Sequence, residues 1–337
     1  MEMPYNDIIR KFIDMYAGRL RNQVSFMLSA CNFYMPIFEE ALDAYGLPLE
    51  LRYLPIIESA LNPSAVSRAG ASGLWQFMIG TGKIYGLESN SLVDERRDPI
   101  KATWAAARYL KEMYDIYGDW NLVIAAYNCG PGTINKAIRR ANGETDYWKI
   151  YNYLPKETRG YVPAFIAANY VMTYYCDHNI CPMETNIPAS TDTVQVNQNL
   201  HFEQIADLCN VPLDQIKSLN PQYKKQMIPG DSKPYTLRLP IDAISTFIDK
   251  QDTIYAHRAD ELFRNRKTVA VKDITPATRK TTTAVAGKGK LTYYTIKSGD
   301  TLSTIAGKYG VTIKDIQRWN GMSNTKIAAG KRLKIYK

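Results

Sequence analysis

The feature that most constrains this fold is an internal repeat at a spacing of 100 residues. A module that occurs twice indicates a chain built from separate pieces rather than around one core. Each copy reads as strand, helix, short turn, helix and strand, and it spans about 45 residues, a common repeat size. The identical pairs are Ile205 and Ile305, Ala206 and Ala306, Val211 and Val311, Ile216 and Ile316, and Asn220 and Asn320; Leu213 and Ile313 match in kind.

The residues before these copies favour helices. Pro36 predicts the first turn of one helix and Gly46 its end, because proline suits an N-terminal turn and glycine follows a C-terminus. Asp98, followed by a first-turn proline, and Asp119 each predict an N-cap. A further apolar helix is expected from Tyr161 to Tyr175. Strand signals are nearly absent here, so this part is predicted to be all-α.

A change of pattern near residue 190 sets the domain boundaries. Alternating apolar residues in Thr193–Val196 and Tyr235–Leu239 predict strands. Residues 241–265 favour helix, and residues 266–290 are rich in Lys, Thr, Ala and Gly, which is typical of a linker. At 337 residues the chain is too long for one ordinary core. We expect a mainly α domain over 1–188, a βααβ module over 191–240, a helical segment with a basic flexible linker over 241–290, and a second βααβ module over 291–337.

The charge is unevenly distributed. The net charge of +9 divides into −2 for residues 1–190 and +11 for residues 191–337. Residues 291–337 alone carry +7. A basic terminal region suits an anionic polymer such as nucleic acid or acidic cell wall, although a solvated linker and surface would look the same.

The five cysteines are too few for a disulfide scaffold. Cys176 and Cys181 bracket His178, an arrangement that fits a local disulfide, free thiols or half of a metal site. A zinc site needs about four ligands, and the chain has only three histidines. We therefore expect no metal and no cofactor.

The second repeat copy contains Tyr294-Thr295-Ile296-Lys297-Ser298-Gly299-Asp300-Thr301-Leu302, followed by Trp319 and Asn320. Over residues 293–336 it closely resembles the LysM domain, which implies binding to polymers that contain N-acetylglucosamine. The family's sugar site lies between the loop from Ser298 to Thr301 and the loop from Asn324 to Ile327. Asp300 or Thr301 can also cap the next helix, and for Asp300 capping alone is an alternative. The implied glycan-binding residues are Gly299, Asp300, Thr301, Asn324 and Ile327.

The first copy departs from this pattern in its first loop. It reads Asn199-Leu200-His201 where the second has Gly299-Asp300-Thr301, and residues 191–249 carry a net charge of −2. This copy resembles a degenerate LysM domain, and we expect it to bind glycan weakly or not at all.

Glu58 is the candidate catalytic residue. It stands where the apolar pattern Leu51, Leu54 and Ile57 ends. Cleaving a glycosidic bond requires a proton donor, and a carboxyl at a helix C-terminus among apolar neighbours is held in its acid form. A solvated glutamate at a helix end is the ordinary alternative.

Four sequence blocks support a catalytic role for Glu58. They are 58–67 (ESALNPSAVS), 70–78 (GASGLWQFM), 125–132 (AAYNCGPG) and 157–162 (ETRGYV). In order and spacing they resemble the soluble lytic transglycosylase family, related to goose-type lysozyme, over about residues 30–175. This resemblance implies a lysozyme-like catalytic domain over residues 1–188, followed by LysM modules.

The resemblance also implies individual roles. Glu58 matches the catalytic acid/base, and Ser67 matches a hydroxyl that hydrogen-bonds it. Gln76 and Met78 match residues lining the cleft. Core packing is an alternative for Met78, Tyr127 and Tyr161, and Cys129 replaces the small apolar residue usual in the family. The remaining matches are Tyr127 and Asn128, which close the site, and Tyr161, near the acid.

The resemblance assigns no second carboxylate of the kind that a hydrolase needs. Asp94, Glu95 and Asp98 read as a loop and a helix cap, whereas hydrolases need a second base or nucleophile. The family chemistry instead lets Glu58 deprotonate the substrate's own C6 hydroxyl, leaving 1,6-anhydro-N-acetylmuramic ends. The alternatives are a goose-type muramidase, a non-catalytic wall-binding protein and a nucleic-acid binder; the last lacks interleaved aromatics.

The same resemblance sets an expected location and partner. No apolar run approaches the roughly 18–20 residues of a membrane span, and no signal peptide precedes the first helix pattern. We expect a trimmed form whose missing N-terminal segment supplied any membrane anchor. The expected protein is a monomer acting on peptidoglycan strands, not nucleic acid, in the periplasm of a Gram-negative bacterium.

Overall fold

The structure is a computed structural model that describes residues 1–185, 187–188, 190–263, 291–297, 299–320, 322, 325 and 327–336. The chain divides into two compact units, Met1–Ile274 and Thr275–Lys337. The predicted linker over residues 266–290 lies outside the described residues.

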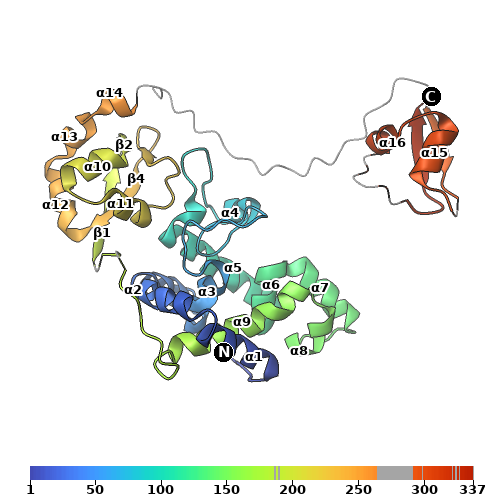
Figure 1. Ribbon diagram of the computed structural model, residues 1–337, viewed down its shortest axis with the longest axis horizontal. Coiled ribbons are helices and arrows are strands. Elements are labelled where there is room, and N and C mark those ends of the chain that lie inside the picture. Colours follow the sequence, from blue (N-terminus) through green and yellow to red (C-terminus); the bar gives the residue numbers. More distant parts are fainter. Residues whose placement is uncertain are drawn as a thin grey trace. The chain divides into compact units, whose positions relative to one another are not determined.

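The described chain before Thr191 is helical, as predicted, and contains isolated bridges but no strand. Figure 1 shows these helices in blue to green. Within the described ranges, no helix is long and apolar enough to cross a lipid bilayer. The α-helices are α1 (Asp7–Ala17), α2 (Arg21–Ala44), α3 (Leu54–Ser59), α4 (Ile79–Ile84), α5 (Pro99–Tyr117), α6 (Trp120–Cys129), α7 (Pro131–Arg140), α8 (Tyr147–Ile150) and α9 (Lys156–Thr173), and the 3-10 turns are η1 (Leu49–Tyr53), η2 (Glu95–Arg97) and η3 (Tyr151–Tyr153).

The helix caps follow the sequence in most places. Asp98 accepts from two backbone N–H groups at 3.0 Å at the start of α5, and Asp119 accepts from that of Leu122 at 2.7 Å in α6. Gly46, with φ +63°, follows the end of α2 as predicted. Pro36, however, does not begin a helix, because α2 starts at Arg21 and runs through it. Buried α2 residues on both sides of Pro36 keep the helix continuous despite the hydrogen bond that proline removes.

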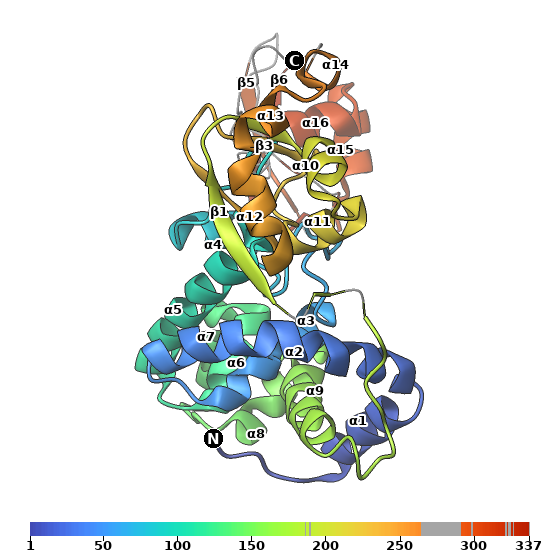
Figure 2. The same ribbon diagram turned by 90° about the vertical axis from the view of Figure 1, so that its left-hand side faces the viewer.

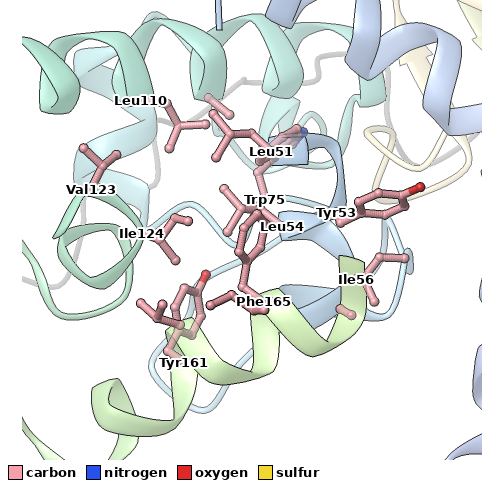
Figure 3. Packing of buried hydrophobic residues seen from close by; sticks show 14 of the residues in the cluster. Leu51, Tyr53, Leu54, Ile56, Trp75, Leu110, Val123, Ile124, Tyr161 and Phe165 are labelled. Atoms are coloured by element: carbon pink, nitrogen blue, oxygen red, sulfur yellow. The ribbon is translucent and has the colours of Figure 1, made fainter. Parts of the chain in front are cut away.

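Helix α9 lies at the centre of the helical domain and packs against α1, α3 and α6. Figure 3 shows Tyr161 and Phe165 projecting from α9 into the core beside Leu54 of α3 and Ile124 of α6. Helices α3, α6 and α9 carry Glu58, Tyr127, Asn128 and Tyr161, so the packing of the core also fixes the mutual positions of these candidate site residues.

The first repeat copy forms a module together with the helices that follow it. Strand β1 pairs antiparallel with β4, and β2 with β3. Phe247 and Ile254 of the following helices are buried in the same core as Ile205, and Figure 2 shows α12 beside β1. We call residues 190–256 the docked module. Its elements and the helix beyond them are β1 (Thr191–Val196), β2 (Asn199–His201), α10 (Phe202–Cys209), α11 (Leu213–Leu219), β3 (Met227–Pro229), β4 (Tyr235–Pro240), α12 (Ile241–Asp249), α13 (Gln251–Ala256) and α14 (Ala259–Leu262).

The docked module is attached to the helical domain through residues 88–97, which we call the docking loop. Val93 of this loop forms a bridge with Tyr223, and Leu92 and Val93 are buried in the module's core. Two backbone hydrogen bonds, from Lys224 to Leu92 at 2.8 Å and from Asp94 to Gln222 at 2.9 Å, flank the bridge. The loop thus supplies part of the core that the module needs.

The second repeat copy has the predicted βααβ order. Strand β5 (Leu291–Thr295) pairs antiparallel with β6 (Arg332–Tyr336), and α15 (Leu302–Tyr309) and α16 (Ile313–Asn320) lie between them in the chain. Ile305, Ile316 and Trp319 are buried in its core. We call residues 291–336 the terminal module.

Candidate active site

Glu58 projects from the last turn of α3 into a cleft. The helix ends at Ser59 and is followed by Ala60 and Leu61, both in the left-handed conformation with φ of +52° and +59°. The cleft has a volume of about 450 Å³, and Glu58 is half-buried in it. A helix C-terminus is an unfavourable place for a negative charge, which favours the protonated form.

The carboxyl of Glu58 is held as an acid by its surroundings. Burial raises its pKa to about 7, the hydrogen bond that Tyr161 donates to its Oε1 works against this rise, and the charge of Glu157 adds to it. Near neutral pH a substantial fraction of the molecules therefore carries the proton, which a general acid requires.

Two walls enclose this carboxyl. One is formed by α1 and α2, with Tyr16, Gln23 and Met27 among its residues. The other is residues 65–78, which we call the cleft loop. Glu58 is the only carboxylate among the described residues that line the cleft.

The cleft loop places Ser67 and Gln76 on the cleft but leaves Met78 outside its lining. The Gln76 side chain donates to the carbonyl of Gly73 at 2.8 Å and to that of Ala65 at 3.3 Å. Met78 precedes α4 with 45% of its surface exposed.

Ser67 is exposed, and its hydroxyl oxygen accepts from the backbone of Ala71 at 3.0 Å. The expected hydrogen bond from Ser67 to Glu58 does not occur among the hydrogen bonds of the described residues. The side-chain partner of Glu58 is Tyr161.

Tyr127 and Asn128 stand at the end of α6. The Tyr127 hydroxyl donates to the carbonyl of Trp75 at 2.7 Å, which ties α6 to the cleft loop. Burial, followed by the charge of Glu58, keeps the pKa of Tyr127 well above its usual value. Asn128 accepts from the Thr158 hydroxyl at 2.8 Å. Burial likewise keeps the pKa of Tyr161 well above its usual value. Both tyrosines are therefore neutral: Tyr161 donates to the Glu58 carboxyl, whereas the hydroxyl of Tyr127 binds the cleft loop.

Sequence reasoning missed the wall made by α1 and α2. Burial raises the pKa of Tyr16 to about 12, and Tyr16 interacts electrostatically with Tyr161. Tyr16 follows Ile9 and Ile13 at helical spacing, a pattern that reads as core. These residues also precede the stretch that resembles the transglycosylase family, so no motif marked them.

The other candidate carboxylates have structural partners. Asp94 pairs with Arg96 and Glu95 with Lys101, while Asp98 caps α5. None of them lines the cleft.

No cluster of three or more potential metal ligands occurs in the ranges that the structure describes. All five cysteines are free, and Cys176 and Cys181 are exposed. The structure therefore contains no disulfide bond between Cys176 and Cys181.

The terminal module presents part of the implied sugar site. Thr301, not Asp300, caps α15, while Asp300 accepts from the backbone of Lys297 and the hydroxyl of Tyr294, both at 2.8 Å. Gly299 has φ +87° in the same loop, and Ile327 is half-buried. Ser298 and Asn324 lie outside the described residues.

Three family profiles match the chain: the transglycosylase SLT domain over residues 35–150, the LysM-like domain of lytic transglycosylase MltD over 190–256 and the LysM domain over 294–335. Together with the cleft these matches define a lytic transglycosylase that carries LysM-type modules. Membrane-bound lytic murein transglycosylase D of Escherichia coli (strain K12) is 31% identical over 339 residues, which cover 99% of this chain and 70% of that protein. The chain belongs to the lytic murein transglycosylase D family.

Two further similarities involve soluble enzymes. The soluble lytic murein transglycosylase of Escherichia coli (strain K12) is 33% identical over 124 residues, covering 35% of this chain and 19% of that protein. The crystal structure of the 70 kDa soluble lytic transglycosylase from Escherichia coli is 29% identical over 42% of this chain and 24% of that chain, with a TM-score of 0.37.

Proposed function

We propose that the cleft cleaves the β-1,4 bond between N-acetylmuramic acid and N-acetylglucosamine in peptidoglycan, with Glu58 as the single general acid and base. The observation that carries this proposal is a lone carboxyl in the cleft, half-buried, hydrogen-bonded by Tyr161, with a pKa of about 7. A second carboxylate, which hydrolases use to activate water or to attack the sugar, is not among the described cleft residues.

In the first half of the reaction, protonated Glu58 gives its proton to the leaving oxygen, and C1 of the muramic residue becomes oxocarbenium-like. In the second half, the Glu58 carboxylate takes the proton from the C6 hydroxyl of the same residue, and O6 bonds to C1. The enzyme ends with the proton that it began with, and the product is a 1,6-anhydro end. Attack from within the same sugar is favoured over water because the two atoms are already held together.

The surrounding residues have supporting roles in this proposal. Tyr161 keeps the Glu58 carboxyl oriented, and Tyr127 holds the cleft loop through Trp75. Ser67, Gln76, Met78 and Asn128 would contact the glycan or shape its path. In the terminal module, glycan would bind Gly299, Asp300, Thr301, Asn324 and Ile327.

The proposal extends to the organisation and location of the protein. Residues 1–188 would be the catalytic domain, the docked module would bind glycan weakly or not at all, and residues 291–337 would attach the enzyme to the wall. We expect a monomer on the periplasmic side of the envelope. Its attachment to a membrane would agree with the printed description of the Escherichia coli relative as membrane-bound.

Replacing Glu58 by Gln tests the assignment. The amide can still accept the hydrogen bond from Tyr161 but cannot donate and recover a proton. Because general acid–base catalysis supplies about 10²–10⁴-fold, and one group acts in both steps, turnover of purified peptidoglycan should fall by at least the upper value. Turnover near the wild-type rate would remove Glu58 from the mechanism.

The pH dependence of thermal stability shows whether the Glu58→Gln variant is folded. The folded state raises the pKa of Glu58, so the unfolded chain loses this proton first and wild-type stability falls as the pH rises from about 4.5 to about 7. Gln cannot ionise and avoids this loss, which amounts to about 3 kcal/mol at 1.36 kcal/mol per pKa unit. Glu58→Gln should therefore have the higher Tm at pH 8, with a smaller difference at pH 5.

A further inference from the structure

The side chain of Arg96, in the docking loop, binds backbone carbonyls of the cleft loop. The guanidinium Nη1 donates to the carbonyl of Gly70 at 2.8 Å and to that of Phe77 at 2.9 Å. These carbonyls lie on either side of the segment that carries Gln76. A planar group that binds both can fix the shape of this segment in a way that a single contact cannot.

The cleft loop is also packed against the backbone of Arg96. Gly73 has φ +88°, and a Cβ at this position would lie only 1.7 Å from the carbonyl oxygen of Arg96. The carbonyl of Gly73 accepts the hydrogen bond from the Gln76 side chain at 2.8 Å. The position of Gln76 in the cleft is therefore set, through Gly73, by the docking loop.

The other nitrogens of the Arg96 guanidinium bind Asp94, which lies next to Lys224 of the docked module. Nε and Nη2 of Arg96 donate to the two carboxylate oxygens at 2.9 and 2.8 Å. Lys224 of the module has its Nζ 3.7 Å from Asp94 Oδ2 and donates to the carbonyl of Asn90 at 2.7 Å. Lys224 of the module thus contacts both the backbone of the docking loop, at Asn90, and its charged side chain Asp94.

This network is buried and charged. The side chains of Arg96 and Asp94 are only 6% and 2% exposed. Although burial alone would raise the pKa of Asp94, hydrogen bonds from Arg96 and the charges of Arg96 and Lys224 lower it. Buried ion pairs add little net stability compared with apolar packing, and their best-supported use is to specify one arrangement.

We propose that the docked module is a positioning element for the catalytic cleft, in which Lys224 and Asp94 orient Arg96 and Arg96 holds the cleft loop beside Glu58. Arg96 is a positioning residue, since it contacts the cleft loop rather than the reacting group. The proposal rests on the proposed function of Glu58 and adds a role for a LysM-type module that needs no glycan binding.

The test compares Lys224→Met with Lys225→Met in the full chain. Both variants lose one lysine charge at neighbouring positions, but Lys225 is exposed and has no part in the network. With short soluble glycan fragments as substrate, kcat/KM of Lys224→Met should fall by about 2- to 30-fold, the range for residues that couple two sites. Lys225→Met should retain the wild-type value.

The pH profile supplies a readout that simple destabilisation does not move. The groups that interact with Glu58 are Tyr161 and Glu157 on α9 and Tyr127 on α6, while Tyr16 of α1 lines the same cleft and interacts with Tyr161. Lys224→Met leaves all of them intact. A displaced cleft loop admits water, which lowers the pKa of Glu58 from about 7 toward its ordinary value. The alkaline limb of kcat/KM should therefore move to lower pH in this variant only.

Arg96→Lys examines the same chain of contacts from its other end. Lysine keeps the charge beside Asp94 but cannot reach the carbonyls of Gly70 and Phe77 at the same time. Its loss of kcat/KM should equal or exceed that of Lys224→Met, and the double variant should lose no more than Arg96→Lys alone.

A lower Tm for Lys224→Met, with kcat/KM and an alkaline limb identical to those of Lys225→Met, would overturn the proposal. If Arg96→Lys does not fold, the comparison of Lys224→Met with Lys225→Met still tests the proposal. Failure of the proposed function has a different signature, namely an active Glu58→Gln variant or products without anhydro ends.

Discussion

The docked module and the terminal module share one skeleton and use it differently. In each, one asparagine ties the second helix to the last strand. Asn220 exchanges two hydrogen bonds of 2.8 Å with the backbone of Arg238, and Asn320 exchanges two of 2.7 Å with that of Lys334. Both also donate to the carbonyl four residues earlier, at 2.9 Å. The repeat thus preserves the contact that closes the fold.

The difference lies in the loop before the first helix. The terminal module has Asp300 there, half-exposed and bonded to Lys297 and Tyr294. The docked module has Leu200, fully buried, in a strand that pairs with β3. Both loops still end in a helix cap, His201 or Thr301. We infer from this difference that the same small fold serves as an internal part of the enzyme in one copy and as a binding module in the other.

The largest expected contrast is in glycan binding. Residues 291–337 alone should be retained by insoluble peptidoglycan, whereas residues 1–263, which keep the docking loop that completes the core of the docked module, should be retained far less. Their charges add to the contrast, with +7 for residues 291–337 against −2 for residues 191–249. Sedimentation at low and high salt separates the contributions, because salt screens exposed charges. Equal retention of both fragments would show that the loop sequence does not decide binding.

The second contrast concerns stability. Asn220 is buried and Asn320 is half-exposed, although they make the same hydrogen bonds. Asn220→Ala leaves several buried polar groups unpaired and should cost about 3 kcal/mol of unfolding free energy, whereas water can replace part of the loss in Asn320→Ala, for about 1 kcal/mol. Urea unfolding of residues 1–263 and of residues 291–337 measures each value. Equal costs would mean that the deeper burial of Asn220 does not change what its hydrogen bonds contribute to stability.

The third contrast is between two residues of the terminal module: Asp300, which shapes the loop, and Thr301, which caps α15. Asp300→Ala removes the acceptor for Lys297 and Tyr294 and should weaken glycan binding about tenfold, close to the loss of 1–2 hydrogen bonds. Thr301→Ala removes the cap of α15 and should cost about 1 kcal/mol of stability. Titration with chitin fragments and thermal unfolding distinguish the two. A stability loss without a binding loss in Asp300→Ala would assign it a structural role alone.

The smallest expected effect comes from deleting residues 266–337. A tether raises the local concentration of the cleft near the polymer without changing its chemistry. Digestion of whole sacculi should slow several-fold, while short soluble glycan fragments should be turned over as before. An equal loss on both substrates would mean that the terminal module contributes to the cleft itself.

The helical domain, both modules and Glu58 as a candidate acid could be predicted from the sequence, because local patterns and motifs mark them. Asp98 and Asp119 act through hydrogen bonds within one helical turn, so their effect can be read locally. Pro36 shows the limit of this reading, because the buried face of α2 overrides a local preference. Glu58 stood out through the motifs around it, since a glutamate at a helix end is otherwise ordinary.

The docking of the first module could not be read from the sequence in the same way. Leu92 and Val93 form a short apolar run in a loop, and their partner Tyr223 lies far along the chain. Likewise, nothing in the spacing of Tyr16 distinguishes a cleft wall from a core position. Both features depend on contacts between distant segments, which no local pattern encodes.

The most direct test of the central claim is mass spectrometry of the ends produced when the enzyme digests purified peptidoglycan. If Glu58 acts alone and the C6 hydroxyl of the substrate attacks C1, the new ends are 1,6-anhydro-N-acetylmuramic acid, lighter by one water than reducing ends. We expect these ends from the wild-type protein and none from Glu58→Gln. Reducing ends as the main wild-type product would contradict it and indicate a hydrolase.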